Sequence, residues 1–131
     1  DMPINHKIFL AQFDTIRKIA DEGPCILVGR CADYALEEYS NVLSVFIHAD
    51  MDARIRRIAR IYDLTDAKAK ELIKKTDKRR SSYYNYYSNK KWGAAESYNI
   101  CLDSSILGID GTAEAIEQLV ALRESITDPK L

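Results

Sequence analysis

The chain has 131 residues, which is enough for one domain and too few for two. Apolar residues make up 47% of it and charged residues 30%, a balance that argues against a disordered chain. No apolar run approaches the roughly 18 residues of a membrane span, and no secretory leader is recognisable, so we expect no membrane partner. The three cysteines include no C-x-x-C pair, which argues against a disulfide scaffold or a zinc site and favours a reducing, cytoplasmic setting.

The formal net charge is only −1, but the charges are unevenly distributed along the chain. Residues 54–91 contain 13 Lys and Arg against 4 Asp and Glu, while the remainder contains 6 against 16. This asymmetry predicts that the basic segment faces an anionic partner. A solvated helix face would produce the same pattern, so composition alone leaves both interpretations open.

The first predicted element is a helix over residues 6–22, where apolar residues recur at helical spacing. Gly23-Pro24 ends it, because glycine suits a left-handed cap and proline cannot continue a helix. Residues 25–28 are an unbroken apolar run, which predicts a strand buried on both faces. Cys25 and Cys101 both lie in apolar runs, and we interpret them as small core residues.

A short helix is predicted at residues 33–38, followed by a strand over residues 42–48 that is rich in β-branched and aromatic residues. Asp50 is a favourable N-cap for a helix over residues 51–62, in which three isoleucines form one apolar stripe. The isoleucine stripe predicts that the arginines of this helix point outward.

Thr65 can cap the next helix, which we expect to end near Tyr87. A third strand is predicted at residues 99–102, and a last helix begins at residues 110–112. Strands that alternate with helices predict an α/β protein with a mostly parallel sheet. Ligands of such sheets bind beyond the carboxyl ends of the strands, so the residues that follow each strand are the candidate site.

Gly29, Arg30 and Asp33 follow the first predicted strand. Glycine lets the backbone approach a ligand closely, and the arginine fork of donors suits phosphate or a base edge. A surface arginine after a turn would give the same sequence.

Four arginines, Arg54, Arg56, Arg57 and Arg60, follow the second predicted strand within two helical turns. Like charges at this spacing repel each other by a few tenths of a kcal/mol per pair, which is consistent with an anion between them. The alternative is a solvated basic face.

Residues 74–92 combine basic side chains around Asp77 with four tyrosines in five positions. Such a segment can bind nucleotides or nucleic acid through phosphate contacts and base stacking. For Tyr83 and Tyr87 we favour packing on the core, with the hydroxyls reaching water.

The order of these features is more specific than any one of them. In chain order they are Gly29-Arg30 after a strand, Ala49-Asp50 before Arg54-x-x-Arg57, Asp77-x-Arg79, and Asp103-Ser104-Ser105 after the last strand. Over about residues 25–120 this series resembles the second half of cytidylate kinases, and more closely the cytidylate kinase-like family of bacterial proteins.

The resemblance implies a P-loop α/β fold with a doubly wound parallel sheet, helices on both faces, and a lid-like basic helical segment at about residues 62–92. It implies transfer of the γ-phosphoryl group of ATP, with Mg²⁺, to a nucleoside monophosphate, with a CMP-like acceptor favoured. Small nucleotides rather than nucleic acid are then the expected partners, and a homo-oligomer stays open.

The resemblance also assigns site residues. Arg30 matches an arginine that faces the acceptor nucleotide, and Arg54 and Arg57 match the pair at the start of the lid, near ATP. Asp77 and Arg79 match the far end of the lid, and Ser104 would lie near the donor base. The expected catalytic residues are Arg57, Asp77 and Arg79, and the expected substrate- and ATP-binding residues are Arg30, Asp33, Arg54, Arg80 and Ser104.

Three features depart from the family pattern. The 131 residues contain no G-x-x-x-x-G-K-[ST] motif, Val28 replaces an aspartate before Gly-Arg, and Cys31 replaces an aspartate after it. We therefore expect this chain to be the C-terminal portion of a nucleotide kinase core, inactive without a P-loop supplied from outside it. The P-loop strand is then expected between residues 25–28 and 42–48, which should not pair with each other.

Two alternatives come from other functional classes. A nucleotide-binding protein that has lost catalysis would explain Val28 and the missing P-loop motif. A nucleic-acid-binding module would use residues 74–92, and its affinity would fall steeply with salt.

Overall fold

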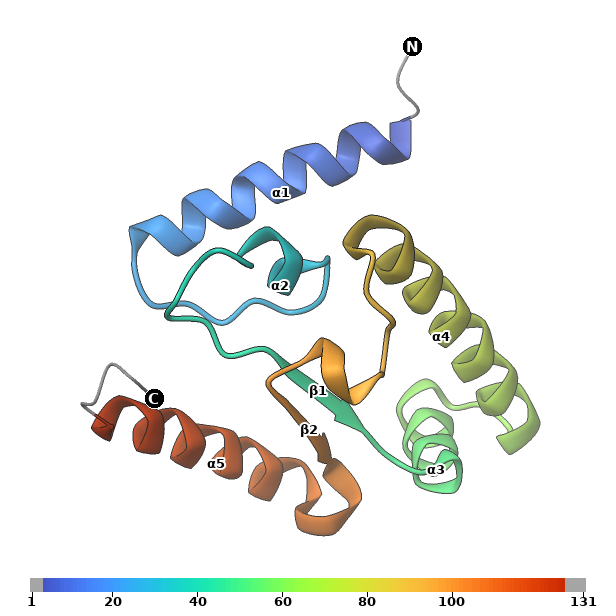
Figure 1. The fold of residues 1–131 in the computed structure, drawn as a ribbon. Helices are drawn as coiled ribbons and strands as arrows, with labels where there is room; N and C mark the ends of the chain where they lie inside the picture. Colours follow the sequence, from blue (N-terminus) through green and yellow to red (C-terminus); the bar gives the residue numbers. More distant parts are fainter. Residues whose placement is uncertain (1–3, 127–131) are drawn as a thin grey trace.

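The computed structural model describes residues 4–126, which form a mostly helical, mixed α/β structure (Figure 1). The elements in chain order are α1 (Ile4–Glu22), α2 (Ala32–Ala35), β1 (Val45–His48), α3 (Met51–Tyr62), α4 (Asp66–Ser88), the 3₁₀ helix η1 (Ala95–Ser97), β2 (Ile100–Asp103) and α5 (Ser104–Ser125). No helix within this range is long and apolar enough to cross a membrane.

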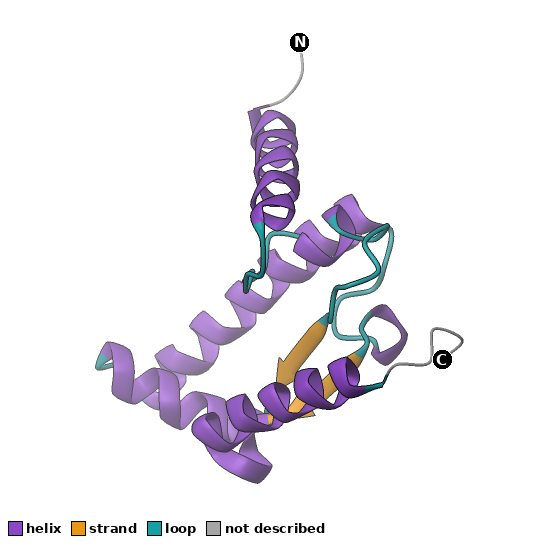
Figure 2. Cartoon of the chain, turned by 90° about the vertical axis from the view of Figure 1, so that its left-hand side faces the viewer, coloured by secondary structure: helices purple, strands orange, loops and turns teal. Residues whose placement is uncertain are grey.

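The sheet of the described residues consists of β1 and β2, which pair in parallel. Their register runs from Val45 opposite Ile100 to His48 opposite Asp103, so both strands end at the same edge. Helix α5 packs against β2, and α3 leaves the carboxyl end of β1 (Figures 1 and 2). The predicted parallel pairing is therefore confirmed for these two strands.

The predicted strand at residues 25–28 does not form. These residues make none of the backbone hydrogen bonds found among residues 4–126, and Ile26 and Val28 are 94% and 88% exposed. An apolar strand needs hydrogen-bonded neighbours, and no strand within residues 4–126 supplies one. The interpretation of Cys25 as a core residue is wrong for this chain, since its side chain is exposed. Residues 25–28 and β1 do not pair, but since residues 25–28 form no strand, the expected P-loop strand between them stays a prediction.

Other bounds differ from prediction by a few residues. The strand expected at residues 42–48 is shortened to β1, and the helix expected at residues 33–38 is shortened to α2. The last helix begins at Ser104, but Gly108 interrupts it with φ 72° and ψ −178°. Glycine adopts this backbone conformation without a side-chain clash, so the helix that continues past the kink begins close to the predicted start.

Two apolar clusters form the core. In one, Phe9, Cys31 and Tyr84 are buried, which joins α1, the turn before α2, and the last third of α4. In the other, Ile16, Ala35 and Leu36 join α1 to α2. The first cluster fixes the end of α4, which belongs to the lid-like segment of residues 62–92, beside the turn that carries Arg30. These two parts of the chain are far apart in sequence, so the sequence does not reveal that they are close in space.

Helices α3 and α4 pack together as a hairpin. Asp50 caps α3 by accepting a hydrogen bond from the Ala53 amide at 2.7 Å, and Thr65 caps α4 by accepting one from the Lys68 amide at 3.2 Å. Each cap satisfies amides that the first helical turn leaves without partners, so both helices begin where the sequence predicts. Ala69 is fully buried in this hairpin.

Candidate functional site

The edge at which β1 and β2 end carries a pocket of about 280 Å³, which we call the strand-end pocket. His48 and Asp103 are register partners there, and Ile106, Leu107 and Thr112 of α5 contribute its other walls. Hydrogen bonds from the Ser105 hydroxyl and amide lower the pKa of Asp103, so the carboxylate stays charged.

Ser104, an expected nucleotide-binding residue, lies at the same edge. Its hydroxyl is 3.4 Å from the His48 carbonyl oxygen, to which it donates. It therefore bridges the ends of the two strands beside the strand-end pocket, and its predicted place near the donor base stays a prediction.

Arg30 lies in a turn of unusual backbone geometry. Gly29, Arg30 and Cys31 have φ values of 69°, 58° and 56°, so three successive residues occupy the left-handed region. The Ala32 amide closes the turn by donating to the Gly29 carbonyl at 3.1 Å. Left-handed conformations are costly for residues other than glycine, and such strain is concentrated at functional sites.

The side chain of Arg30 is exposed and lies close to groups that come from α1. Burial raises the pKa of Tyr83, and the positive charge of Arg30 opposes that shift. A second pocket of about 280 Å³, the α1 pocket, lies between α1 and the segment before the turn, and Gln12, Val28 and Arg30 contribute to its lining. Gln12 also accepts a hydrogen bond from Tyr83 at 3.2 Å.

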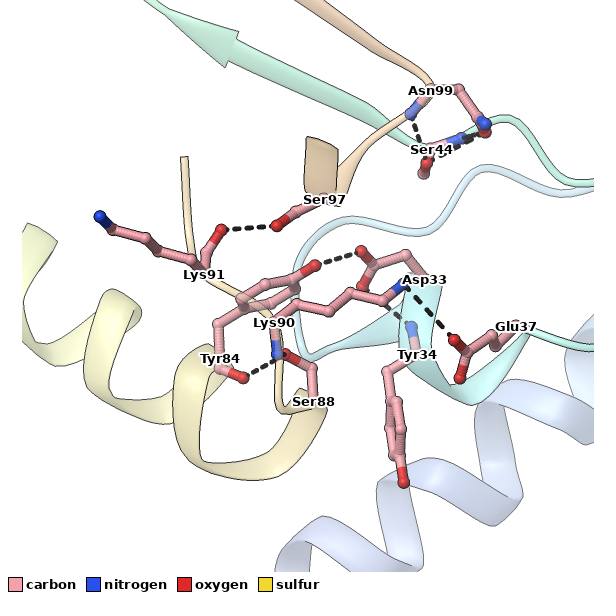
Figure 3. Close-up of polar contacts among 10 residues, drawn as sticks. All are labelled: Asp33, Tyr34, Glu37, Ser44, Tyr84, Ser88, Lys90, Lys91, Ser97 and Asn99. Carbon is pink, nitrogen blue, oxygen red and sulfur yellow. Dashed lines mark hydrogen bonds and ion pairs between the residues drawn. The ribbon is translucent and has the colours of Figure 1, made fainter. Parts of the chain in front are cut away.

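Asp33 does not point freely into solvent. One carboxylate oxygen accepts a hydrogen bond from the Tyr84 hydroxyl at 2.7 Å, and the other accepts one from the Tyr34 amide at 2.9 Å (Figure 3). Burial, reinforced by this bond to Asp33, raises the pKa of Tyr84 well above its ordinary value. Tyr84 is therefore a permanent hydrogen-bond donor at physiological pH.

Arg54 and Asp77, assigned by resemblance to ATP binding and to catalysis, pair with each other. Two guanidinium nitrogens of Arg54 donate to the two carboxylate oxygens at 2.8 and 2.7 Å, and this pairing raises the pKa of Arg54. The side chains are 32% and 24% exposed. The expectation that all arginines of α3 point outward is thus wrong for Arg54, because α4 places a carboxylate within its reach.

The remaining arginines of the predicted set lie on the surface of the hairpin and its end. Arg57 and Arg79 are exposed. Arg80 is exposed too, and its guanidinium lies 5.2 Å from the ring centre of Trp92, a cation–π distance. The structure therefore joins Asp33 and the turn that carries Arg30 to the end of α4, Arg54 to Asp77 within the hairpin, and Ser104 to the strand ends.

The predicted packing of Tyr83 and Tyr87 on the core is confirmed, but the Tyr83 hydroxyl donates to Gln12. Tyr87 stacks on Phe9 with ring centres 4.0 Å apart, and Tyr83 packs against the same cluster. Sequence reasoning missed Tyr84, the most buried of the four tyrosines. It follows Ala69 and Ile73 on the buried face of α4, so extending that apolar stripe would have found it.

Residues 4–126 contain no group of three or more His, Cys, Asp or Glu side chains that could hold a metal ion. The carboxylates at the ends of the two strands, Asp50 and Asp103, both accept hydrogen bonds from the first turn of the helix after them. The described residues therefore do not form a site that fits Mg²⁺.

Polar groups at the ends of parallel strands, with a basic helical hairpin leaving one of those ends, define a mixed α/β protein with a candidate ligand site at one edge of its sheet. Comparison with known proteins gives the family. The model of the cytidylate kinase-like family matches residues 1–106, and the chain belongs to that family.

A solved structure of an uncharacterized protein from Eubacterium ventriosum ATCC 27560 is similar to the chain, with 31% sequence identity and a TM-score of 0.80. The match covers 93% of this chain and 75% of the other. No curated protein matches the chain.

Proposed function

We propose that the protein is an ATP-dependent phosphotransferase that acts on a nucleoside monophosphate, with a CMP-like acceptor. The observation that carries this proposal is the course of the α3–α4 hairpin. It leaves the carboxyl end of β1 with exposed arginines, and its far end packs beside the turn that carries Arg30. Family membership supports the same activity.

In this proposal Arg30 binds the phosphate of the acceptor nucleotide, while Arg57 and Arg79 neutralise charge on the transferring group. Phosphoryl transfer depends mainly on positioning and on electrostatic stabilisation, which suits exposed arginines on the hairpin. Closure of the hairpin about its loop, with the end of α4 kept in the core, would exclude water and so prevent hydrolysis. Arg80 would add a further phosphate contact near Trp92.

Arg54 and Asp77 receive a different role from the one expected of them. Because they form a bidentate pair, we propose that they set the geometry of the hairpin and thereby the positions of Arg57 and Arg79. Asp33 likewise supports the Arg30 turn through its bond to Tyr84.

The donor nucleotide is assigned to the strand-end pocket, with Ser104 at its edge and with Ile106 and Leu107 as apolar walls for the base. The β- and γ-phosphates of ATP require a cradle of backbone amides, and the sequence contains no P-loop motif. We propose that a segment outside these 131 residues supplies the P-loop, and that Mg²⁺ is held there with the phosphates. Its strand would pair with residues 25–28, where the apolar side chains of Ile26 and Val28 are exposed.

The test is a coupled assay of ADP formation with the complete protein, ATP, Mg²⁺ and a panel of CMP, dCMP, UMP and AMP. The expected result is acceptor-dependent turnover that is highest with a cytidine nucleotide. Arg57→Ala should reduce this turnover strongly, and Lys70→Ala, an exposed basic change on the same hairpin, should not. Absence of acceptor-dependent turnover with the whole panel would overturn the proposal.

Nucleotide binding without catalysis is the second candidate, and Val28 favours it, because an aspartate precedes Gly-Arg in the cytidylate kinase pattern. This candidate predicts saturable binding of ATP or CMP to the complete protein without turnover. The nucleic-acid alternative predicts instead that binding to an oligonucleotide weakens steeply as salt rises.

A further inference from the structure

The strained turn that presents Arg30 needs a physical cause. Arg30 and Cys31 both have left-handed backbone conformations, which are costly for residues other than glycine and persist only where the surroundings impose them. The single backbone hydrogen bond across the turn, from Ala32 to Gly29, does not by itself select a left-handed course over an ordinary one. Other contacts must therefore hold the turn.

Two contacts hold the turn, and both involve Tyr84 of α4. Cys31 is 4% exposed and is packed in one cluster with Phe9 and Tyr84, which fixes the end of the turn. Beyond it, the Tyr84 hydroxyl donates to Asp33 at 2.7 Å, as Figure 3 shows. The side chain of Asp33 also accepts from the Tyr34 amide, so the bond to Tyr84 anchors the first turn of α2.

Tyr84 is itself held from the other side. Its ring stacks on Tyr98 with centres 5.8 Å apart, and its carbonyl oxygen accepts a hydrogen bond from Ser88. The Tyr98 hydroxyl accepts a hydrogen bond from the Gly93 amide at 3.2 Å. The contacts around Tyr84 thus connect the Arg30 turn to the end of α4 and to the segment that leads into β2.

We propose that Tyr84 is a positioning residue for the acceptor nucleotide: its hydrogen bond to Asp33 holds the Gly29–Cys31 turn and so orients Arg30. The functional part of this inference rests on the proposed phosphotransferase activity. Because Tyr84 belongs to α4, the same bond couples the acceptor site to the far end of the lid-like segment. Asp33, expected to bind substrate, then acts through the turn and not through the nucleotide.

The decisive variant is Tyr84→Phe in the complete protein, since it keeps the buried ring and removes only the donor. The matched control is Tyr86→Phe, because Tyr86 lies on the same helix and is 75% exposed. We expect Tyr84→Phe to raise the KM for CMP about tenfold, corresponding to about 1.4 kcal/mol for a hydrogen bond to a charged group. The kcat and the KM for ATP should change less than about twofold, a split that general destabilisation does not produce.

Two variants of Asp33 test whether its hydrogen bond to Tyr84 matters for the KM for CMP. Asp33→Asn keeps an oxygen that accepts from Tyr84, so its KM for CMP should stay closer to the wild-type value than that of Asp33→Ala. Equal KM values for Asp33→Asn and Asp33→Ala would contradict the inference.

A second measurement does not depend on activity. The Ala35 and Leu36 amides donate to the carbonyls of Cys31 and Ala32, so they report the stability of the turn. Hydrogen exchange at these amides should be about tenfold faster in Tyr84→Phe than in wild type or Tyr86→Phe. Faster exchange without phosphoryl transfer in any variant would overturn the proposed function and retain the coupling. Unchanged exchange and an unchanged KM for CMP would overturn the coupling.

Discussion

The bidentate pair of Arg54 and Asp77 gives a quantitative prediction about the hairpin. Two unit charges about 4 Å apart attract by roughly 4 kcal/mol at an effective dielectric constant of 20, before desolvation and side-chain entropy are subtracted. The two side chains are 32% and 24% exposed, so the pair lies between a surface pair, about 0–1 kcal/mol, and a buried one, about 3–5 kcal/mol when broken. We therefore expect a coupling free energy of about 1–2 kcal/mol for this bidentate geometry.

The perturbation is a double-mutant cycle of Arg54→Ala, Asp77→Ala and both together in the complete protein, measured by urea unfolding. Arg56→Ala is the matched control, because it removes an exposed arginine from the same helix and should cost less than about 0.5 kcal/mol. Arg54→Lys should recover only part of the coupling, because lysine cannot form the bidentate contact. A coupling below about 0.3 kcal/mol, within the error of additivity, would refute the role of the pair in setting the hairpin.

Three further predictions concern single side chains. Arg57→Ala should lower kcat by at least about 10³-fold, which is the lower end of the effect of a charge-neutralising arginine. The free energy of unfolding measured in urea should change by less than about 0.5 kcal/mol. A loss of stability with kcat per folded molecule intact would make Arg57 a structural residue. Burial, followed by the charge of Asp33, raises the pKa of Cys31 from 9.0 to about 11. At pH 8, iodoacetamide should therefore modify Cys31 only after unfolding, as followed by mass spectrometry. Rapid labelling of Cys31 in the folded protein would contradict the burial of this side chain. The pKa of Tyr84 is raised in the folded state, so its contribution to stability is complete below about pH 10 and declines as the pH rises above that value. The free energy of unfolding of wild type should therefore fall between pH 10 and 11 more steeply than that of Tyr84→Phe. Equal slopes of unfolding free energy against pH would count against a buried Tyr84 hydroxyl.

Local sequence signals predicted the hairpin well. The helix predicted at residues 51–62 has those bounds in the structure, because Asp50 caps it and its isoleucines form one stripe. Thr65 likewise marks the start of α4. Caps and stripes act within one turn of helix, so a single sequence contains what is needed to find them.

Contacts between side chains that are far apart in the chain could not be predicted from the sequence. Arg54 and Asp77 are 23 residues apart, and Asp33 and Tyr84 are 51 apart, so no local pattern marks either contact. In both cases a residue that had been assigned to the ligand is bound to another side chain of the chain.

Residues 25–28 show why composition alone does not make a strand. Their apolar run is typical of a buried strand, yet a strand exists only through hydrogen bonds to a neighbour, and within residues 4–126 they have none. The exposure of Ile26 and Val28 is the expected consequence, and it motivates the proposed strand from a segment outside these residues.

The most direct test of the central claim is a crystal structure of the complete protein with a bisubstrate analogue in which five phosphates link adenosine to cytidine. The account predicts that Arg30 contacts the acceptor-side phosphate, that Arg57 and Arg79 contact the bridging phosphates, and that a P-loop strand pairs with residues 25–28. An analogue bound away from Arg30 and the hairpin, or a direct backbone ladder between residues 25–28 and β1, would contradict it.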